Sequence, residues 1–235
     1  MVFVSRPLVM FIASRAQGRF LPFGIARRCK AISSTPDGGK SRHEYEVLGR
    51  DLVYSGWRKI VKKNVRFDGN KSFVFDVVHQ ENPSVAVFVW HTASKTLTLI
   101  KEFSPGREMV AHGVVAGVYE KNKHDSPLQA AKFELEEEAH LSGGTWHSLC
   151  EDAETTINAD KYSSNEFFCW LVVDPYVTPT PRALDDEESI EIERGITMQR
   201  AMSMLDRGEL SMVSSFVVLA GVRKLRQLGL VSPGC

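Results

Sequence analysis

The sequence predicts an α+β fold. Short runs rich in β-branched and aromatic residues are typical of strands, and other segments place apolar residues at helical spacing. The two kinds of segment follow one another without a regular strand–helix–strand alternation, which favours this class. The chain has 235 residues, of which 43% are hydrophobic and 25% charged. This composition is typical of a globular protein.

Five segments have the composition of strands. Two of them, Ser84–His91 and Lys95–Phe103, are separated only by a short polar turn, which predicts a hairpin. The run Glu166–Asp174 is mostly apolar, as expected of a strand that is buried on both faces. The other two expected strands are Lys71–Gln80 and His112–Glu120.

Three helices are expected. The first begins at Ser126, which can cap it, and Pro127 suits the first helical position. Gln129 completes a capping box with Ser126. Apolar residues at helical spacing predict two more helices near the C-terminus. The three expected segments are Ser126–Leu141, Thr197–Leu210 and Met212–Gly229.

The first part of the chain has an unusual charge pattern. No acidic residue precedes Asp37, whereas several arginines and serines do. An Arg-rich, Ser-bearing and acid-free start is typical of organellar transit peptides, and a secretory signal or a basic tail are the alternatives. We expect residues 1–40 to be a transit peptide and linker, and residues 41–235 to be one domain. The expected destination is a mitochondrion or plastid, with the mitochondrion slightly preferred.

Overall charge and cysteine usage exclude several classes of partner. Lys+Arg and Asp+Glu both number 29, so the net charge is zero and gives no general attraction to nucleic acid or to an anionic membrane. No apolar run approaches the roughly 20 residues of a membrane span. The four cysteines, which are scattered, favour a reducing compartment over a disulfide framework or zinc site. They are Cys29, Cys150, Cys169 and Cys235.

The first expected helix carries clustered acids. At about 100° per residue, an apolar stripe that should face the core is formed by Leu128, Ala131, Leu135 and Ala139. Glu134, Glu137 and Glu138 share an adjacent face, while Glu136 lies on the opposite flank and is expected to be solvated. Neighbouring like charges repel by a few tenths of a kcal/mol per pair. A hard divalent cation would reverse that repulsion, although a solvated acidic surface is the alternative.

The stretch AGVYEKNKHDSPLQAAKFELEEEAHL, residues 116–141, resembles the Nudix box, G-x5-E-x7-R-E-U-x-E-E-x-G-U, where U is aliphatic. Gly117 matches the first glycine if the loop holds two extra residues, and Asp125 then falls where the first glutamate belongs. Phe133 stands where the box has arginine, and His140 stands where it has glycine. The positions in register are Glu134, Leu135, Glu137, Glu138 and Leu141.

Other segments resemble the ADP-ribose pyrophosphatase-like branch of the Nudix hydrolases. VVAG before the box is similar to the branch's ELPAG, and TLTLIKEF is similar to its vvLvrQyR strand. The acidic loop, strand and two helices after residue 184 resemble its tail. The resemblance implies a Nudix-like α/β/α sandwich with a mixed sheet. It also implies a homodimer through swapped N-terminal strands, for which Tyr45–Phe67 is the candidate element.

This resemblance implies metal-dependent hydrolysis of a nucleoside diphosphate linked to another moiety, with ADP-ribose or an ADP-sugar as the first substrates to consider. Mg²⁺ is the implied cofactor, with Mn²⁺ as the other candidate. The implied metal ligands are Glu134, Glu137, Glu138 and the main-chain carbonyl of Ala116. The implied catalytic residues are Glu137 and Glu188, with Glu187 as a rival general base. The candidate substrate contacts are Lys101 and Arg107 for phosphate and Tyr162 for a base. The alternatives are that the two cations are plain surface charges and that Tyr162 is a packing residue.

Two functional hypotheses follow from these residues. The retained glutamates favour an active diphosphatase. Departures from the branch pattern favour a catalytically inactive Nudix-fold module that binds a nucleotide or a protein. The departures are Phe133 and, at the positions of the ELPAG acid and the strand arginine, Gly113 and Ser104.

Overall fold

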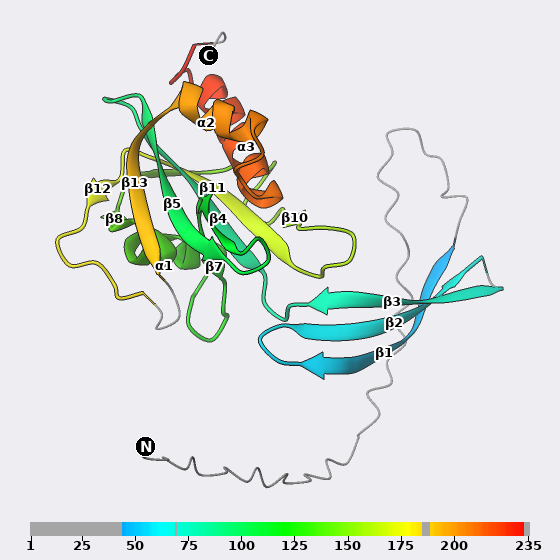
Figure 1. The fold of residues 1–235 in the computed structure, drawn as a ribbon. Helices are drawn as coiled ribbons and strands as arrows, with labels where there is room; N and C mark the ends of the chain where they lie inside the picture. The colour runs from blue at the N-terminus through cyan, green and yellow to red at the C-terminus, as the bar shows by residue number, and fades with distance from the viewer. Residues whose placement is uncertain (1–43, 69, 185–188, 233–235) are drawn as a thin grey trace, which may run out of the picture.

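The structure, a computed structural model, describes residues 44–68, 70–184 and 189–232. The expected transit peptide and the two candidate bases, Glu187 and Glu188, lie outside these residues. Figure 1 shows the elements in chain order. They are β1 (Tyr45–Ser55), β2 (Lys59–Phe67), β3 (Lys71–His79), β4 (Ser84–His91), β5 (Thr96–Ser104), β6 (Met109–Gly113), β7 (Val115–Val118), α1 (Pro127–Ala139), β8 (Leu141–Ser142), β9 (Thr145–Ser148), β10 (Ile157–Asn158), β11 (Glu166–Val173), β12 (Tyr176–Val177), β13 (Ile190–Thr197), α2 (Met198–Asp206) and α3 (Met212–Gln227).

The main body is a sheet covered by helices on both faces, so the expected α/β/α sandwich is confirmed. Its central order is β10-β11-β4-β5-β13, with β6, β7 and β9 attached at the side. The sheet is mixed, because β11 runs parallel to β4 whereas β4 and β5 are antiparallel. Helix α1 lies on one side of the strands, and α2 and α3 lie on the other (Figure 1).

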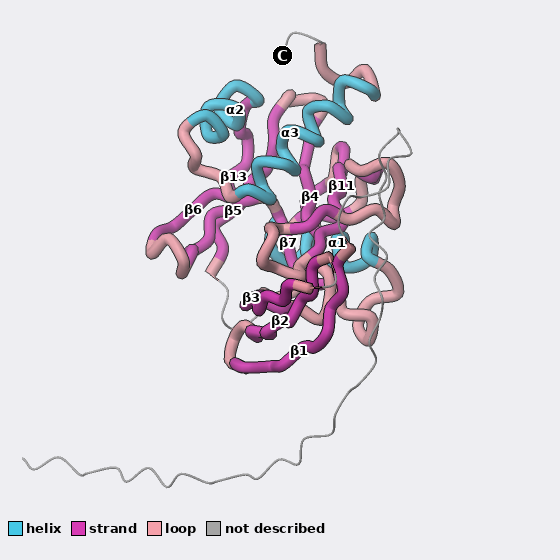
Figure 2. Tube along the Cα trace, turned by 90° about the vertical axis from the view of Figure 1, so that its right-hand side faces the viewer, coloured by secondary structure: helices cyan, strands magenta, loops and turns pink. Residues whose placement is uncertain are grey.

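The two strands of the β4–β5 hairpin diverge like the arms of a fork, and the next two strands, β6 and β7, lie between these arms. The two strands pair with each other only near the turn, from Val89 to His91. Farther along, β7 pairs with β4 and β6 pairs with β5. The single strand expected over residues 112–120 is therefore two strands, one on each arm of the fork. The β5–β6 hairpin extends away from the rest of the sheet (Figure 2).

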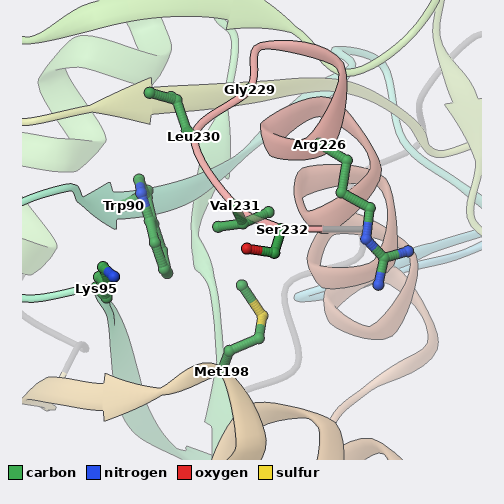
Figure 3. A pocket seen from close by; sticks show the side chains of 8 residues that line it. All are labelled: Trp90, Lys95, Met198, Arg226, Gly229, Leu230, Val231 and Ser232. Carbon is green, nitrogen blue, oxygen red and sulfur yellow. The ribbon is translucent and has the colours of Figure 1, made fainter. Parts of the chain in front are cut away.

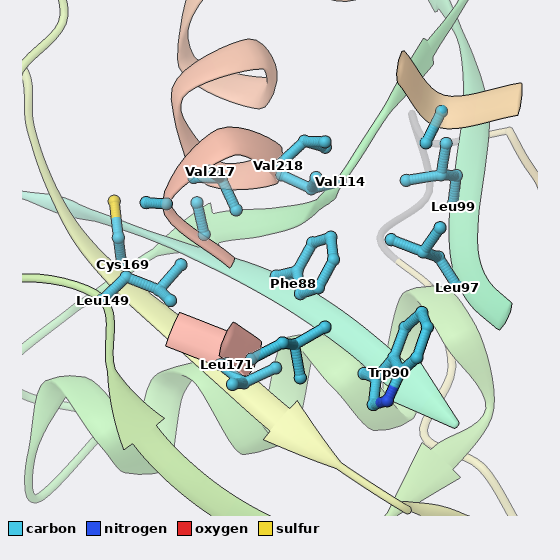
Figure 4. Close-up of a cluster of buried hydrophobic side chains, with 14 of the residues drawn as sticks. Phe88, Trp90, Leu97, Leu99, Val114, Leu149, Cys169, Leu171, Val217 and Val218 are labelled. Atoms are coloured by element: carbon cyan, nitrogen blue, oxygen red, sulfur yellow. The ribbon is translucent and has the colours of Figure 1, made fainter. Parts of the chain in front are cut away.

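Strand β4 is buried on both faces, which explains its continuous apolar sequence. Alternate side chains point to opposite sides of a strand. Phe88 and Trp90 therefore enter the core beneath α2 and α3, where Val217 and Val218 of α3 also lie (Figure 4). Val85 and Val87 enter the second core, beneath α1.

Helix α1 begins and ends largely as its sequence predicts. The Ser126 hydroxyl accepts a hydrogen bond from the backbone N–H of Gln129 at 3.1 Å. The Gln129 side chain accepts from the N–H of Asp125 at 2.6 Å, so the reciprocal bond reaches one residue beyond the expected capping box. The helix ends at His140 in a left-handed conformation with φ of 52°. The expected apolar stripe faces the core, with Ala131, Leu135 and Ala139 buried and Leu128 packed against them.

The N-terminal strands form a separate antiparallel sheet, ordered β1-β2-β3. It lies beside the main body (Figures 1 and 2). Its link to the body includes the Ser164 N–H, which donates to the carbonyl of Val78 at 2.9 Å. Several of its large apolar side chains are exposed, including Leu52, Tyr54 and Trp57. Of the helices in the described residues, none is long and apolar enough to cross a membrane.

Candidate functional site

Two carboxylates of α1 lie against the backbone of β7. Glu138 is only 3% exposed, and its Oε2 accepts a hydrogen bond from the backbone N–H of Ala116 at 2.8 Å. The carboxylate of Glu134, one turn earlier, lies over Gly117, where an added Cβ would stand 1.8 Å from Oε1. Only glycine allows this approach, which gives a physical reason for the glycine at the position matched to the start of the box. The Cβ atoms of residues spaced i, i+4 are neighbours on a helix, so both carboxylates lie on one face of α1.

The other two acids of α1 have different surroundings. Glu137 is half-buried beside this face. Glu136 was expected to be merely solvated, but its Oε2 accepts a hydrogen bond from Nε of Arg182 at 3.2 Å. The Arg182 guanidinium carbon lies 3.6 Å from the centroid of the Phe133 ring. Phe133 also contacts His124, with ring centroids 5.5 Å apart in an edge-to-face arrangement.

The chemistry of these side chains fits a hard divalent cation. Carboxylate oxygens are the ligands that Mg²⁺ and Mn²⁺ prefer. Among the described residues, no group of three or more acidic, histidine or cysteine side chains is gathered closely enough to hold a metal ion alone. Mg²⁺ is usually held by one or two carboxylates together with waters and substrate phosphates. Glu134 and Glu138, both fixed on β7, fit that mode, with Glu137 beside them.

The expected phosphate contacts do not lie beside these carboxylates. Lys101 follows Leu97 and Leu99 on the face of β5 that packs toward α2 and α3, which is opposite to α1. Its ammonium group is paired with Glu191 at 3.0 Å. The guanidinium of Arg107, which belongs to the β5–β6 turn, donates to the carbonyl of Glu209 at 3.3 Å.

The expected base contact, Tyr162, is also engaged elsewhere. Its ring lies 6.4 Å from the ring of Phe75 in β3. Its carbonyl accepts the N–H of Val78 at 2.9 Å. Tyr162 therefore helps to join the N-terminal sheet to the body, and the described contacts do not bring it to the face of Glu134 and Glu138.

A polar cluster on the α2/α3 side was not identified from the sequence. Glu193 of β13 receives hydrogen bonds from His112 Nε2 at 2.7 Å and from Arg200 at 2.8 Å, and Lys101 Nζ lies 3.4 Å away. Burial alone would raise the pKa of Glu193, but the His112 hydrogen bond and the charges of Arg200 and Lys101 outweigh it and lower that pKa. The alternating pattern of β13, Ile-Glu-Ile-Glu, predicts only that Glu191 and Glu193 share one side of the strand; it does not indicate the partners of Glu193.

A second arginine at the end of α1 was also missed. The guanidinium of Arg194 in β13 donates to the carbonyl of Ala139, the last residue of α1, at 2.8 Å. A cation at this end of a helix satisfies a free carbonyl and opposes the negative end of the helix dipole. Neither Arg182 nor Arg194 could be linked to α1 from sequence spacing, because both come from segments more than one strand away.

Of two cavities in the part of the chain that the structure describes, the larger does not lie at the carboxylates. It measures about 480 Å³ and lies where the end of α3 meets β4 (Figure 3). Its walls are mostly apolar, with Trp90, Met198 and Leu230, and two basic residues, Lys95 and Arg226, also line it. This cavity is on the opposite side of the sheet from α1. A smaller hollow of about 180 Å³, next to Glu136, is bounded by Lys132 and Trp146.

Comparisons with known proteins support the fold. No protein-family model matches the chain, and no curated protein matches it. The solved structure of an ADP compounds hydrolase is similar, with a TM-score of 0.66 and 19% sequence identity. The likeness covers 82% of this chain and 100% of that one. The chain therefore shares the α/β/α architecture of an ADP compounds hydrolase.

Proposed function

We propose that this protein is a Nudix-type diphosphatase that hydrolyses a nucleoside diphosphate linked to another moiety and releases a nucleoside monophosphate. ADP-ribose and ADP-sugars are the first substrates to test, since the similar structure is that of a hydrolase of ADP compounds. The observation that supports the proposal most directly is the pair of carboxylates held on β7, Glu138 by the Ala116 N–H and Glu134 by the space over Gly117.

The physical problem in this reaction is that a negatively charged diphosphate repels its nucleophile. Mg²⁺ or Mn²⁺, when bound, neutralises that charge and makes water a better nucleophile. The role of the protein is to hold oxygen ligands in fixed positions. Burial and the 2.8 Å hydrogen bond fix Glu138 on β7, and the absence of a side chain at Gly117 lets Glu134 approach the same strand. Preorganised ligands avoid the cost of rearrangement during the reaction.

The test is turnover of a panel of nucleoside diphosphate derivatives with Mg²⁺ or Mn²⁺, measured as released monophosphate. Glu137→Gln and Glu138→Gln remove one negative charge each with little change of shape, and we expect both to abolish turnover. The matched control is Glu151→Gln, because Glu151 is an exposed acid in a loop away from α1. Wild-type protein that turns over no member of the panel, or Gln variants as active as wild type, would contradict the proposal.

The second candidate function is a catalytically inactive module with this fold that binds a nucleotide or a protein. It is favoured by Phe133, which cannot form the ion pairs of an arginine, and by the placement of Lys101 on the other side of the sheet. Under this hypothesis, calorimetry detects nucleotide binding while no phosphate compound is hydrolysed. Loss of measured turnover in Glu138→Gln would exclude it.

We also propose a homodimer formed through the β1–β3 sheet. A sheet that exposes Leu52, Tyr54 and Trp57, the last at 80%, presents an apolar surface that a second copy could cover. Light scattering coupled to size exclusion measures the mass directly. We expect a dimer for the wild type and a monomer for Leu52→Lys combined with Trp57→Lys. A wild-type monomer at micromolar concentration contradicts this proposal.

The organellar destination of the protein is a further proposal from its Arg-rich, acid-free start. A fluorescent protein fused after residues 1–40 should enter mitochondria or plastids. A diffuse cytosolic signal would reject a transit peptide, and a secreted product would favour the signal-peptide alternative.

A further inference from the structure

The last turn of α1 has an unfavourable charge distribution. It carries three consecutive acids, Glu136, Glu137 and Glu138. The structure describes the whole of this turn, and the turn contains no basic residue. The C-terminal end of a helix is the negative end of its dipole. Acids at that end are opposed by the dipole as well as by each other. Stability and geometry of this turn therefore depend on positive charge from elsewhere in the chain.

Two arginines from other segments supply positive charge. Arg194 from β13 binds the terminal carbonyl of α1 at Ala139. Arg182, from the linker between β12 and β13, binds the carboxylate of Glu136. Arg194 opposes the negative charge at the C-terminal end of the helix, whereas Arg182 lies on the side of the helix beside the acids. Of these two arginines, Arg182 is therefore the one placed to affect the orientation of neighbouring carboxylates.

Phe133 provides the surface on which Arg182 rests. The guanidinium carbon is 3.6 Å from the ring centroid, which is close stacking for a cation on an aromatic face. On a helix, Phe133 neighbours Glu136 at i+3 and Glu137 at i+4. A cation held over Phe133 therefore lies on the side of the helix that carries both. The opposing contact of Phe133 with His124 fixes the ring from the side of the loop before α1.

We propose that Arg182 is a positioning residue for α1. Its guanidinium supplies, from the linker, the positive charge that a residue at position 133 would otherwise have to carry. In doing so it holds Glu136 aside and keeps Glu137 and Glu138 in the orientation that hydrolysis requires. This proposal rests on the proposed diphosphatase function for its kinetic readout. Its charge effect is measurable without turnover.

Removal of the guanidinium should lower kcat without weakening the Mg²⁺ response, whereas a general structural defect would weaken both. For Arg182→Ala we expect kcat to fall by about tenfold or more, because small misplacements of catalytic groups are costly. The Mg²⁺ concentration for half-maximal stabilisation against heat should fall, because the acidic face becomes more negative. Arg182→Lys keeps the positive charge but loses the planar stack on Phe133, so we expect a loss of kcat that is smaller than that of Arg182→Ala.

The decisive experiment moves the positive charge from residue 182 to residue 133. Phe133→Arg places a guanidinium on the helix itself. In the Arg182→Ala background we expect it to restore kcat to within about threefold of wild type and to return the Mg²⁺ response. In the wild-type background it puts two cations in one place and should lower kcat. If Arg182 is only an anchor for the linker, Phe133→Arg is harmful in both backgrounds, and that result overturns the proposal.

A matched control guards against a trivial effect of losing a surface ion pair. Arg200 is similarly exposed and is paired with Glu193 on the opposite side of the sheet, so Arg200→Ala should leave kcat and the Mg²⁺ response unchanged. If the wild type hydrolyses nothing, the diphosphatase proposal fails while Mg²⁺-dependent melting still tests Arg182. A Mg²⁺ response in Arg182→Ala that is weaker than that of the wild type, or equal to that of Arg200→Ala, rejects the positioning role.

Discussion

At Gly117 the backbone lies close to a carboxylate. An added Cβ would overlap the Glu134 carboxylate at 1.8 Å. The overlapped group is the end of a flexible side chain, so it can move away at little cost to folding. We expect Gly117→Ala to fold with nearly the wild-type melting temperature and to lose about 100-fold in kcat, as expected when a ligand is displaced by about 1 Å.

The control for this substitution is Gly106→Ala, because an added Cβ at Gly106 meets nothing within 4 Å. This variant should match the wild type in both turnover and melting. If Gly117→Ala instead melts far below Gly106→Ala, the contact is required for folding and does not only set the position of Glu134.

His140 shows a second residue-scale effect. It ends α1 with φ of 52°, a region that costs a residue with a side chain about 1 kcal/mol or more relative to glycine. Glycine stands at this position in the box that the sequence resembles. We expect His140→Gly to raise the free energy of unfolding by up to about 1 kcal/mol, as measured by urea denaturation. A loss of stability would indicate that the imidazole makes compensating contacts.

At the scale of elements, α3 packs against β4 through a glycine. A Cβ added at Gly221 would lie 2.5 Å from the ring of Phe88, which is buried in the core (Figure 4). Alanine is the better helix former, but a fixed ring in a packed core cannot move aside. We expect Gly221→Ala to destabilise the protein by about 1–3 kcal/mol. Leu219→Ala, at a position 51% exposed on the same helix, should cost much less.

The elements that the sequence predicts well are those whose signal is local. The boundaries of β4 and α1 follow from the continuous apolar run Ser84–His91 and from the Ser126–Pro127 cap. The division of one expected strand into β6 and β7 was missed, because it depends on how the β4–β5 fork opens. The stripe of α1 and the shared face of Glu134 and Glu138 follow from helical spacing.

What the sequence could not predict is mostly long-range contact. The pairing of Arg182 with Glu136 and its stacking on Phe133 join segments separated by several strands. The presence of Glu136 or Phe133 on α1 does not indicate which arginine of the chain will contact them. Lys101 could not be placed for a different reason. Strand alternation determines its side of the sheet only once the orientation of β5 relative to α1 is known. A basic residue near an acidic helix in sequence can therefore lie on the other side of the sheet.

At the scale of the whole molecule, the two faces of the sheet have different electrostatics. The α1 face carries the acids, and the α2/α3 face encloses Glu193 among His112, Arg200 and Lys101. A carboxyl whose pKa is lowered in the folded protein stabilises it above the unfolded pKa, and this stabilisation is lost as the pH falls through the folded pKa. For Glu193 the ordinary pKa is 4.5 and the folded value lies below it.

We therefore expect wild type to be more stable than Glu193→Gln at pH 7, as measured by chemical denaturation. The difference should persist down to about pH 4.5 and narrow below it, because protonated Glu193 then resembles glutamine. A difference that is constant between pH 7 and pH 3 would mean that the shape of the side chain matters and its charge does not.

The parallel pairing of β11 with β4 also has a consequence for folding kinetics. Ser84 pairs with Phe167, so this contact closes a loop that contains the fork, β7 and the whole of α1. Contacts between residues distant in sequence form slowly, because loop closure costs entropy before any contact repays it. Helix α1 is short and acidic at its C-terminal end, so it is at best marginally stable by itself, and Trp170 and Val172 of β11 belong to the core beneath it. The carboxylate face should thus become rigid only late in refolding, after β4 and β11 have paired.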